Sequence, residues 1–222
     1  GNLKGINITL PYKNEIIPKL DACDEIAKAC NAVNTVFLEN KRIIGTNTDG
    51  IGFMNSLMKD ANYKLTEKSE VFLLGAGGAA KGIIYYLLKA KLRKITISNR
   101  NKEKAAHLIS ELNSKNTEVD FQAWENKEIS KNIDLVINTT SFGMNKHEKI
   151  TLSYKNSKNK LLVFDIIYSP SKTLLLNDAE IKGFNIQNGL GMLVRQAAYS
   201  FYKWFGIKIK EREIVEMKEQ LK

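Results

Sequence analysis

A glycine-rich hexapeptide at residues 75–80 joins an apolar run to an amphipathic segment. It reads Gly-Ala-Gly-Gly-Ala-Ala, it follows the apolar residues 71–74, and the next residues, 81–88, are apolar at helical spacing. A strand, a glycine turn and a helix in this order let the backbone approach a pyrophosphate, which then faces the N–H groups and positive end of the helix. The pattern indicates dinucleotide binding; close packing of a strand on a helix is the alternative.

The residues after the next predicted strand, 94–98, indicate which dinucleotide binds. In a dinucleotide fold, the residue that reads the adenosine ribose stands at this strand end, roughly 20 residues past the glycines. The sequence has Asn99 and Arg100 there instead of an acid, with Lys102 and Lys104 close by. An acid would accept from the 2′-hydroxyl of NAD, whereas these cations attract a 2′-phosphate. We therefore predict NADP; a solvated basic helix start is the alternative.

Three polar clusters in the first 56 residues could supply a reaction partner for the cofactor. A cofactor at the carboxyl ends of the predicted strands would face a cleft, and these clusters could line that cleft. They are residues 9–13, 34–35 and 45–50. In the first, a strand end and Pro11 form a rigid turn that aims Lys13 at one place. Turn hydrogen bonds and helix capping are the alternative explanations for Asn34 and Asp49.

The composition is that of a globular protein with room for two small domains or one large one. The chain has 222 residues, 43% of them hydrophobic, and a formal net charge of +10. Its lysines are scattered, so the charge indicates attraction to anionic ligands, and nucleic acid is a remote alternative. No apolar run approaches the roughly 20 residues of a membrane span, and the N-terminus is unlike a signal sequence, which predicts a cytoplasmic protein.

The cysteines and histidines do not have the spacing of a metal site. Cys23 and Cys30 would share one face if residues 22–31 formed a helix, and we interpret both as buried free thiols. His107 and His147 also lack ligand spacing, so we predict no bound metal.

Strands and helices are predicted to alternate from residue 71 onward. The predicted strands are 71–75, 94–98, 118–122, 134–138, 161–166 and 184–186, and the predicted helices are 78–90, 102–113 and 171–182. This pattern indicates the α/β class, with a doubly wound parallel sheet of order 3-2-1-4-5-6, the Rossmann arrangement.

The remaining segments predict a second, smaller α/β domain. They contain predicted strands at 6–10, 33–38 and 42–46 and predicted helices at 23–31, 50–60, 190–205 and 211–221. We predict a substrate domain from residues 1–56 and 190–222, and a dinucleotide-binding domain from residues 57–189.

Eight segments, in order along nearly the whole chain, resemble the signatures of the shikimate dehydrogenase family. They are residues 5–13, 31–35, 45–50, 75–79, 99–100, 138–144, 165–168 and 188–196. The resemblance implies a reversible, NADPH-dependent reduction of 3-dehydroshikimate to shikimate, on the pathway to chorismate and the aromatic amino acids. Hydride delivered to a ketone creates an alkoxide, which needs a proton donor. The resemblance assigns that acid/base role to Lys13 and Asp49.

The resemblance also implies which residues bind substrate and cofactor. Substrate contacts fall on Thr9, Lys13, Asn34, Asp49, Tyr168 and Gln196. Cofactor contacts fall on Gly75, Ala76, Gly77, Gly78, Ala79, Asn99, Arg100, Lys104, Ile166 and Gly189.

The sequence departs from the family pattern at its beginning. Family members have a further N-terminal stretch with a serine-containing motif that holds the substrate carboxylate, whereas this sequence begins at Gly1, just before the lysine motif. The chain is then either an altered enzyme or a fragment of a longer one. The alternatives to shikimate dehydrogenation are broader activity that includes quinate, and an NADP-binding module with little catalysis. We expect a monomer or a homodimer that binds a small molecule, without a nucleic-acid or membrane partner.

Overall fold

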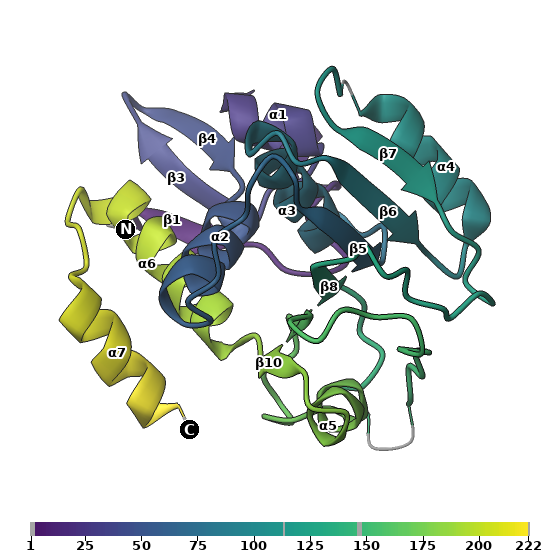
Figure 1. Cartoon of the computed structure of the whole chain (residues 1–222). Coiled ribbons are helices and arrows are strands. Elements are labelled where there is room, and N and C mark those ends of the chain that lie inside the picture. Colours follow the sequence, from purple (N-terminus) through teal and green to yellow (C-terminus); the bar gives the residue numbers. More distant parts are fainter. Residues whose placement is uncertain (1–2, 113, 146–147, 222) are drawn as a thin grey trace.

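The computed structural model describes residues 3–112, 114–145 and 148–221, and places helices around two β-sheets (Figure 1). The strands are β1 (Gly5–Asn7), β2 (Ala22–Cys23), β3 (Thr35–Glu39), β4 (Arg42–Thr46), β5 (Glu70–Leu74), β6 (Lys94–Ser98), β7 (Glu118–Phe121), β8 (Leu135–Asn138), β9 (Leu162–Asp165) and β10 (Asn185–Gln187). The helices are η1 (Ile17–Lys19), α1 (Glu25–Cys30), α2 (Asp49–Lys59), α3 (Gly78–Lys89), α4 (Lys102–Glu111), α5 (Leu174–Ile181), α6 (Leu190–Phe205) and α7 (Glu211–Gln220).

The larger sheet has the strand order β10-β9-β8-β5-β6-β7, and all neighbouring strands are parallel. Counted from β5, this is the order 3-2-1-4-5-6, so the predicted sheet topology is confirmed. The order reverses between β5 and β8. In open α/β sheets, ligands bind at the carboxyl ends of the strands beside such a reversal.

Apolar side chains cover both faces of this sheet, which explains why its strands are continuous apolar runs. Leu73 of β5 belongs to the same buried cluster as Phe53 of α2 and Ile83 of α3. The preceding residue, Phe72, points to the other face and belongs to a second cluster with Leu175 of α5. The strand β5 is therefore held from both sides, and the turn that follows it starts from a fixed position.

The smaller sheet has the order β1-β3-β4-β2. Its centre is a hairpin of β3 and β4, joined at Asn40 and Lys41, which have φ of 51° and 64°. Two consecutive positive φ angles are typical of a type I′ turn, whose twist matches that of antiparallel strands. The predicted strands 33–38 and 42–46 correspond to this hairpin.

The first predicted strand is shorter than expected. Residues 6–10 were predicted as a strand, but β1 ends at Asn7. The chain then turns, and the Tyr12 N–H donates to the Thr9 carbonyl at 2.9 Å. The chain after this turn leads to Lys13, whose side chain lies against Gly78 at the start of α3.

The predicted helix 23–31 is also shorter, which corrects the interpretation of the cysteines. The helix α1 begins after Asp24, whose carboxylate accepts from the Ala27 N–H at 2.9 Å as an N-cap. Cys23 lies before the cap and pairs with β4 as part of β2. Cys23 and Cys30 therefore do not share a helix face, and only Cys30 is fully buried.

The C-terminal helices pack against the smaller sheet and α2. Trp204 of α6 donates through Nε1 to the Val36 carbonyl of β3 at 3.0 Å. Arg195 of α6 is 3% exposed and donates to the carboxylates of Asp60 and Glu211, at distances from 2.6 to 3.0 Å. These bonds attach α7 to α6 and to the end of α2.

The helix α2 contacts α6 on one side and α3 on the other. We propose that it lies at the junction of two units, one formed by residues 1–56 and 190–222 and the other by residues 57–189. The contacts of α6 with β3 support this division.

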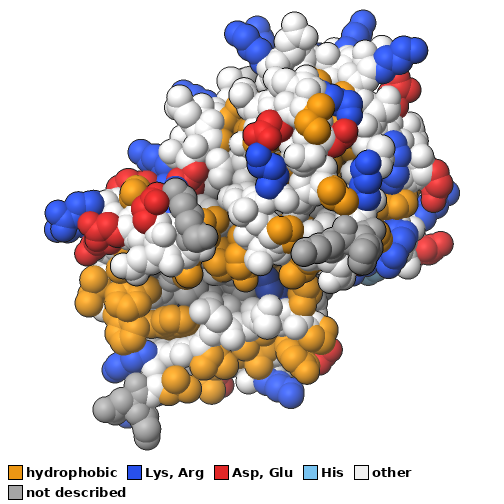
Figure 2. All heavy atoms as spheres, turned by 90° about the horizontal axis from the view of Figure 1, so that it is seen from below, with side chains coloured by type: hydrophobic (Ala, Val, Ile, Leu, Met, Phe, Trp, Pro, Cys, Tyr) orange, Lys and Arg blue, Asp and Glu red, His pale blue; other side chains and the backbone are white. Residues whose placement is uncertain are grey.

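The charged side chains are mixed on the surface seen from below. Figure 2 shows hydrophobic side chains gathered on part of this face, while Lys and Arg are scattered over the rest with Asp and Glu among them. The basic side chains form no continuous patch on this face of the described chain. None of the helices in the described residues has the length and hydrophobicity needed to cross a membrane.

Candidate active site

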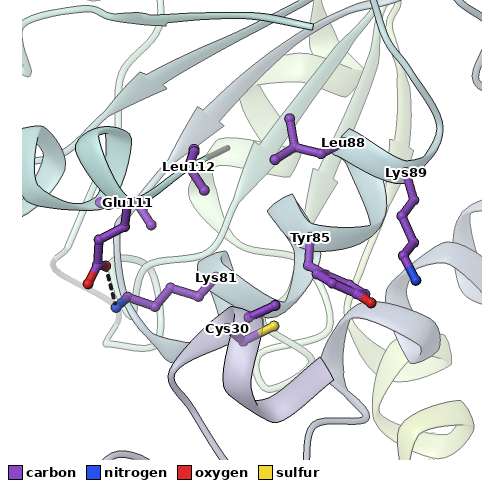
Figure 3. Close-up of a pocket in the computed structure, with 9 residues that line it drawn as sticks. Cys30, Lys81, Tyr85, Leu88, Lys89, Glu111 and Leu112 are labelled. Carbon is purple, nitrogen blue, oxygen red and sulfur yellow. Dashed lines mark hydrogen bonds and ion pairs between the residues drawn. The ribbon is translucent and has the colours of Figure 1, made fainter. Parts of the chain in front are cut away.

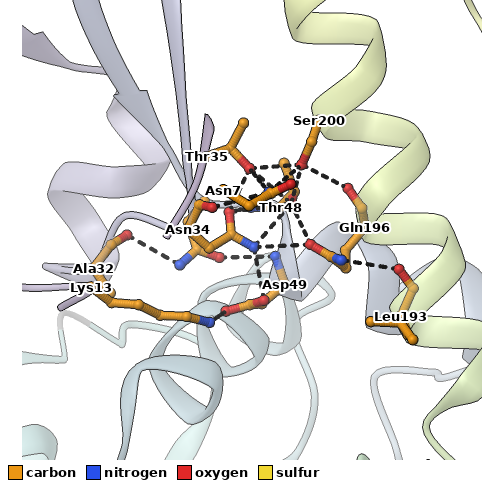
Figure 4. Close-up of polar contacts among 11 residues, drawn as sticks. Asn7, Lys13, Ala32, Asn34, Thr35, Thr48, Asp49, Leu193, Gln196 and Ser200 are labelled. Atoms are coloured by element: carbon orange, nitrogen blue, oxygen red, sulfur yellow. Dashed lines mark hydrogen bonds and ion pairs between the residues drawn. The ribbon is translucent and has the colours of Figure 1, made fainter. Parts of the chain in front are cut away.

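Lys13 and Asp49 form an ion pair between the turn after β1 and the start of α2 (Figure 4). Lys13 Nζ lies 2.6 Å from Asp49 Oδ2, and the two side chains are 12% and 8% exposed. The Lys13 carbonyl accepts from the Val33 N–H at 2.8 Å, which fixes the backbone that carries the ammonium. Asn47 Oδ1 accepts from the Asp49 N–H at 3.0 Å. The pair is thus held from both sides and remains partly open to a ligand.

Asn34 fixes the second oxygen of the Asp49 carboxylate. Its Nδ2 donates to Asp49 Oδ1 at 2.8 Å and to Gln196 Oε1 at 3.3 Å. Its Oδ1 accepts from the Thr48 N–H at 2.8 Å and from the Thr35 hydroxyl at 2.9 Å. Because both bonds to Oδ1 come from donors, the amide nitrogen must face Asp49.

Asn7 and Ser200, to which sequence analysis gave no role, complete this cluster together with Thr35. Ser200 Oγ lies 2.7 Å from Thr35 Oγ1, and Asn7 Nδ2 donates to Ser200 Oγ at 3.2 Å. Ser200 and Thr35 are 0% exposed. Ser200 lies one helical turn after Gln196 on α6, and this i,i+4 spacing is the signal that could have identified it.

The Lys13 side chain also lies against the start of α3. A Cβ placed on Gly78 would be 3.2 Å from Lys13 Cδ, so the lysine stem passes directly over the glycine turn. The helices α2 and α3 approach even more closely, since a Cβ on Gly50 would be 2.0 Å from the Gly82 carbonyl oxygen. These close approaches bring the predicted catalytic pair to the predicted dinucleotide site.

The glycine turn has the shape needed to receive a phosphate group. Gly75 has φ of +113°, which a residue with a side chain rarely adopts, and it follows β5 directly. A Cβ on Gly77 would meet nothing within 4 Å, so its backbone faces open space. No side chain caps α3 at Gly77, whereas Asp24 and Asn101 cap α1 and α4. The N-terminus of α3 is therefore available to an anion, and the turn fits a dinucleotide pyrophosphate.

Arg100 lies at the carboxyl end of β6, beside an exposed loop. Its guanidinium is 5.2 Å from the centre of the Phe142 ring. Asn101 accepts from the Lys104 N–H at 2.6 Å, and Asn99 donates to the Asn101 carbonyl at 2.7 Å. These bonds hold the segment so that its cations remain at the surface, where a 2′-phosphate could reach them.

The other predicted site residues lie around this cluster. Gly189 packs on the backbone of Ile166, because a Cβ there would be 1.8 Å from the Ile166 carbonyl oxygen. Tyr168 is 49% exposed. Among the described residues, the side chains of Thr9 and Tyr168 make no hydrogen bond to Lys13, Asp49, Asn34 or Gln196. The structure thus joins four of the predicted substrate residues and leaves these two outside that network.

A separate cavity of about 430 Å³ lies between α1, α3 and α4 and contains neither Lys13 nor Asp49 (Figure 3). Cys30, Tyr85 and Leu108 are among its lining residues. Burial raises the pKa of the Cys30 thiol to about 12, so this thiol stays protonated at neutral pH and is a poor nucleophile.

His107 contributes to none of these sites. His107 is exposed on α4, and its Nδ1 is 3.6 Å from a carboxylate oxygen of Glu111. His147 lies outside the described residues. Within those residues, no group of three or more His, Cys, Asp or Glu side chains could hold a metal ion.

A doubly wound parallel sheet, an uncapped glycine turn at its switch point and a Lys–Asp pair facing that turn define a dinucleotide-dependent oxidoreductase. The chain belongs to the shikimate dehydrogenase family. Residues 57–170 match the family described as shikimate / quinate 5-dehydrogenase. Residues 1–36 match the shikimate dehydrogenase substrate binding domain, and residues 189–222 match the shikimate 5′-dehydrogenase C-terminal domain.

Individual relatives agree with this assignment. Shikimate dehydrogenase (NADP(+)) of Staphylococcus haemolyticus is 41% identical over 217 residues, which are 98% of this chain and 77% of the relative. A crystal structure of shikimate dehydrogenase with NADP+ has a TM-score of 0.88 and 33% identity, over 99% of this chain and 77% of that one. The crystal structure of Listeria monocytogenes shikimate 5-dehydrogenase with shikimate and NAD has a TM-score of 0.86 and 31% identity. The match covers 97% of this chain and 78% of that chain.

Proposed function

We propose that this chain catalyses the reversible, NADP-dependent reduction of 3-dehydroshikimate to shikimate. The observation that carries the proposal is the Lys13–Asp49 pair, held 2.6 Å apart beside the glycine turn of a dinucleotide fold. Membership of the family and the NADP(+) and shikimate named for its relatives support the choice of substrate and cofactor.

Lys13 is the proton donor in this proposal. NADPH, when bound, supplies the hydride that reduces the ketone carbon. The Lys13 ammonium polarises the ketone oxygen and gives it a proton as negative charge develops there. The resulting amine regains a proton from water, and in the oxidation direction the same amine accepts the proton of the substrate hydroxyl.

Asp49 keeps the ammonium in place and binds the substrate. Its Oδ2 accepts from Lys13 and its Oδ1 from Asn34, so each oxygen has one fixed partner and a further lone pair for a substrate hydroxyl. We propose that Asn34 and Gln196 bind the other ring hydroxyls. Thr9 and Tyr168 would complete the substrate site from the exposed loops.

The chain offers one surface for each part of NADP. The N-terminus of α3 would hold the pyrophosphate on residues 75–79. Arg100, with Asn99 and Lys104 beside it, would hold the 2′-phosphate, and Ile166 and Gly189 would lie on the nicotinamide side.

An assay of NADPH oxidation with 3-dehydroshikimate tests the proposal directly. The parent chain should consume NADPH only when the ketone is present, and Lys13→Ala should abolish this consumption. Calorimetry with NADP and then shikimate provides the second measurement. Binding of the nucleotide without any binding of shikimate would favour the alternative of an NADP-binding module.

Oxidation of quinate is a second candidate, because the matched family is described as shikimate / quinate 5-dehydrogenase. Quinate has one more ring hydroxyl, so the two acids differ in the hydrogen bonds that they need. Rates with shikimate and quinate, each with NADP and NAD, separate the candidates. Arg100 leads us to expect a preference for NADP with either acid.

We infer that the partners of this chain are small molecules and that it works as a monomer or a homodimer without nucleic acid. The mixed charges on the face in Figure 2 support the absence of a nucleic-acid partner. The free thiols Cys23 and Cys30 are compatible with a reducing compartment such as the cytoplasm. Sedimentation with and without NADP would determine the oligomeric state.

A further inference from the structure

Asn138 and Asp165 form a buried polar pair that the proposed reaction does not use. They are the last residues of the adjacent strands β8 and β9 and face each other in the sheet register. Asn138 Nδ2 donates to Asp165 Oδ1 at 3.0 Å, and both residues are 0% exposed. The pair lies at the carboxyl ends of the strands, below the edge where the cofactor would bind.

Asp165 is a buried carboxylate whose hydrogen-bond partners are neutral donors. Besides Asn138, the Ile167 N–H donates to Oδ1 at 3.1 Å and the Thr173 hydroxyl to Oδ2 at 2.7 Å. Burial raises the pKa of Asp165 to about 6, although these three bonds lower it. Keeping a charge in the interior costs free energy unless it is well paired. The free-energy cost of this buried carboxylate points to a role besides stability.

Asn138 fixes the loop that follows β8. Its Oδ1 accepts from the Thr140 N–H at 3.0 Å and from the Thr140 hydroxyl at 2.7 Å, while Nδ2 also donates to the Phe142 carbonyl at 3.2 Å. Phe142 in turn lies below the guanidinium of Arg100. The position of Arg100, at the expected 2′-phosphate end, therefore depends on the loop that Asn138 holds.

Asp165 fixes the loop that follows β9. Its bonds to the Ile167 N–H and to Thr173 span the stretch that contains Ile166, on the expected nicotinamide side, and Tyr168, an expected substrate contact. The two loops also touch, since a Cβ on Gly143 would be 3.3 Å from Thr173 Cβ. One buried pair thus connects the loops at both ends of the expected cofactor site.

We propose that Asn138 and Asp165 act as positioning residues that hold these two loops in the arrangement that binds NADP. The inference rests on the proposed function. Neither side chain touches the cofactor; each acts through the loop to which it is bonded. Their loss should therefore weaken cofactor binding and slow turnover. Loss of Asn138, whose loop holds no expected substrate contact, should leave the affinity for shikimate little changed.

The test compares three folded variants with the parent chain by direct NADPH titration and by steady-state kinetics. Asp165→Ala removes all three acceptor bonds. Asp165→Asn keeps one acceptor oxygen, and its amide can donate to the Thr173 hydroxyl oxygen. This variant should therefore keep most of the NADPH binding that Asp165→Ala loses. Asp134→Ala is the matched control, because Asp134 precedes β8 at the opposite end of the sheet and accepts from the Glu70 N–H at 2.9 Å.

For Asp165→Ala we expect the NADPH Kd to rise and kcat to fall by about tenfold or more, because two loops lose their anchor. In Asn138→Ala, whose loop holds no expected substrate contact, the KM for shikimate should stay within about threefold, and Asp134→Ala should bind NADPH like the parent. A folded Asp165→Ala chain with the parent's NADPH Kd would overturn the proposal. If this variant does not fold, Asn138→Ala replaces it with the same expectations. A parent that binds NADPH without turnover would refute the proposed function, and the titration would still decide this inference.

Discussion

Lys13 Nζ lies 2.6 Å from Asp49 Oδ2, while the same lysine stem passes over Gly78 at the start of α3. One side chain therefore contacts both the residue that would orient it and the turn that would hold the cofactor. This relationship accounts for how a reacting ketone could meet a hydride donor and a proton donor at the same time.

Replacement of Lys13 by alanine should abolish turnover without preventing cofactor binding. We expect kcat to fall by about 10² to 10⁴, because the developing alkoxide loses its proton donor. The NADPH Kd, measured by titration, should change less than about threefold, since the turn itself is intact. Lys28→Ala, an exposed lysine of α1, is the control. Similar losses in both measurements would contradict the role of Lys13.

Replacement of Arg100 by glutamine should change the cofactor preference. The guanidinium is the main cation at the expected 2′-phosphate position, and charge-assisted bonds to phosphate are strong. We expect the KM for NADPH to rise by about 10- to 100-fold, with little change for NADH. Arg212→Gln, an exposed arginine of α7, should leave both values unchanged. Equal effects on the two cofactors would show that Arg100 does not read the phosphate.

Two glycine substitutions should separate binding from folding. Gly77→Ala places a methyl group in open space at a φ of −89°, so the chain should fold normally while NADPH binding weakens by about tenfold or more. Gly50→Ala forces a methyl group to 2.0 Å from the Gly82 oxygen, and it should lower the melting temperature. Calorimetric melting and NADPH titration check both variants. Unchanged binding in Gly77→Ala would argue against a pyrophosphate at this turn.

Replacement of Asp165 by asparagine should alter how stability depends on pH. Burial raises the pKa of Asp165 from 3.8 to about 6, so the folded chain binds this proton more tightly than the unfolded chain. The contribution of Asp165 to stability is therefore present at about pH 4 and is lost as the pH rises through about 6. Asparagine does not titrate. As the pH rises from about 4 to neutral, the unfolding free energy of the variant, relative to that of the parent, should increase by about 1 to 3 kcal/mol.

Urea titrations of both proteins at about pH 4 and at neutral pH measure this difference, and groups shared by the two chains cancel. A difference that does not depend on pH would mean that Asp165 keeps its ordinary pKa in the folded chain.

The sequence was sufficient for features that depend on local pattern. Continuous apolar runs specify strands that are buried on both faces, and the glycines at 75–78 specify a turn between β5 and α3, because backbone conformation and burial are local requirements. The hairpin of β3 and β4 follows in the same way from two apolar runs separated by a short polar turn. The sheet order could be predicted because few topologies satisfy the rules for crossover connections.

Only the tertiary structure decided which polar side chains meet. Ser200 is 165 residues from Thr35, and Asn138 is 27 residues from Asp165, yet each pair is joined by a buried hydrogen bond. The sequence also misplaced Cys23, because pairing with β4 and the cap at Asp24 together outweigh the helical pattern. Such pairings depend on how distant elements pack, so the sequence by itself determined the fold and the chemistry available, and packing decided how the site is held together.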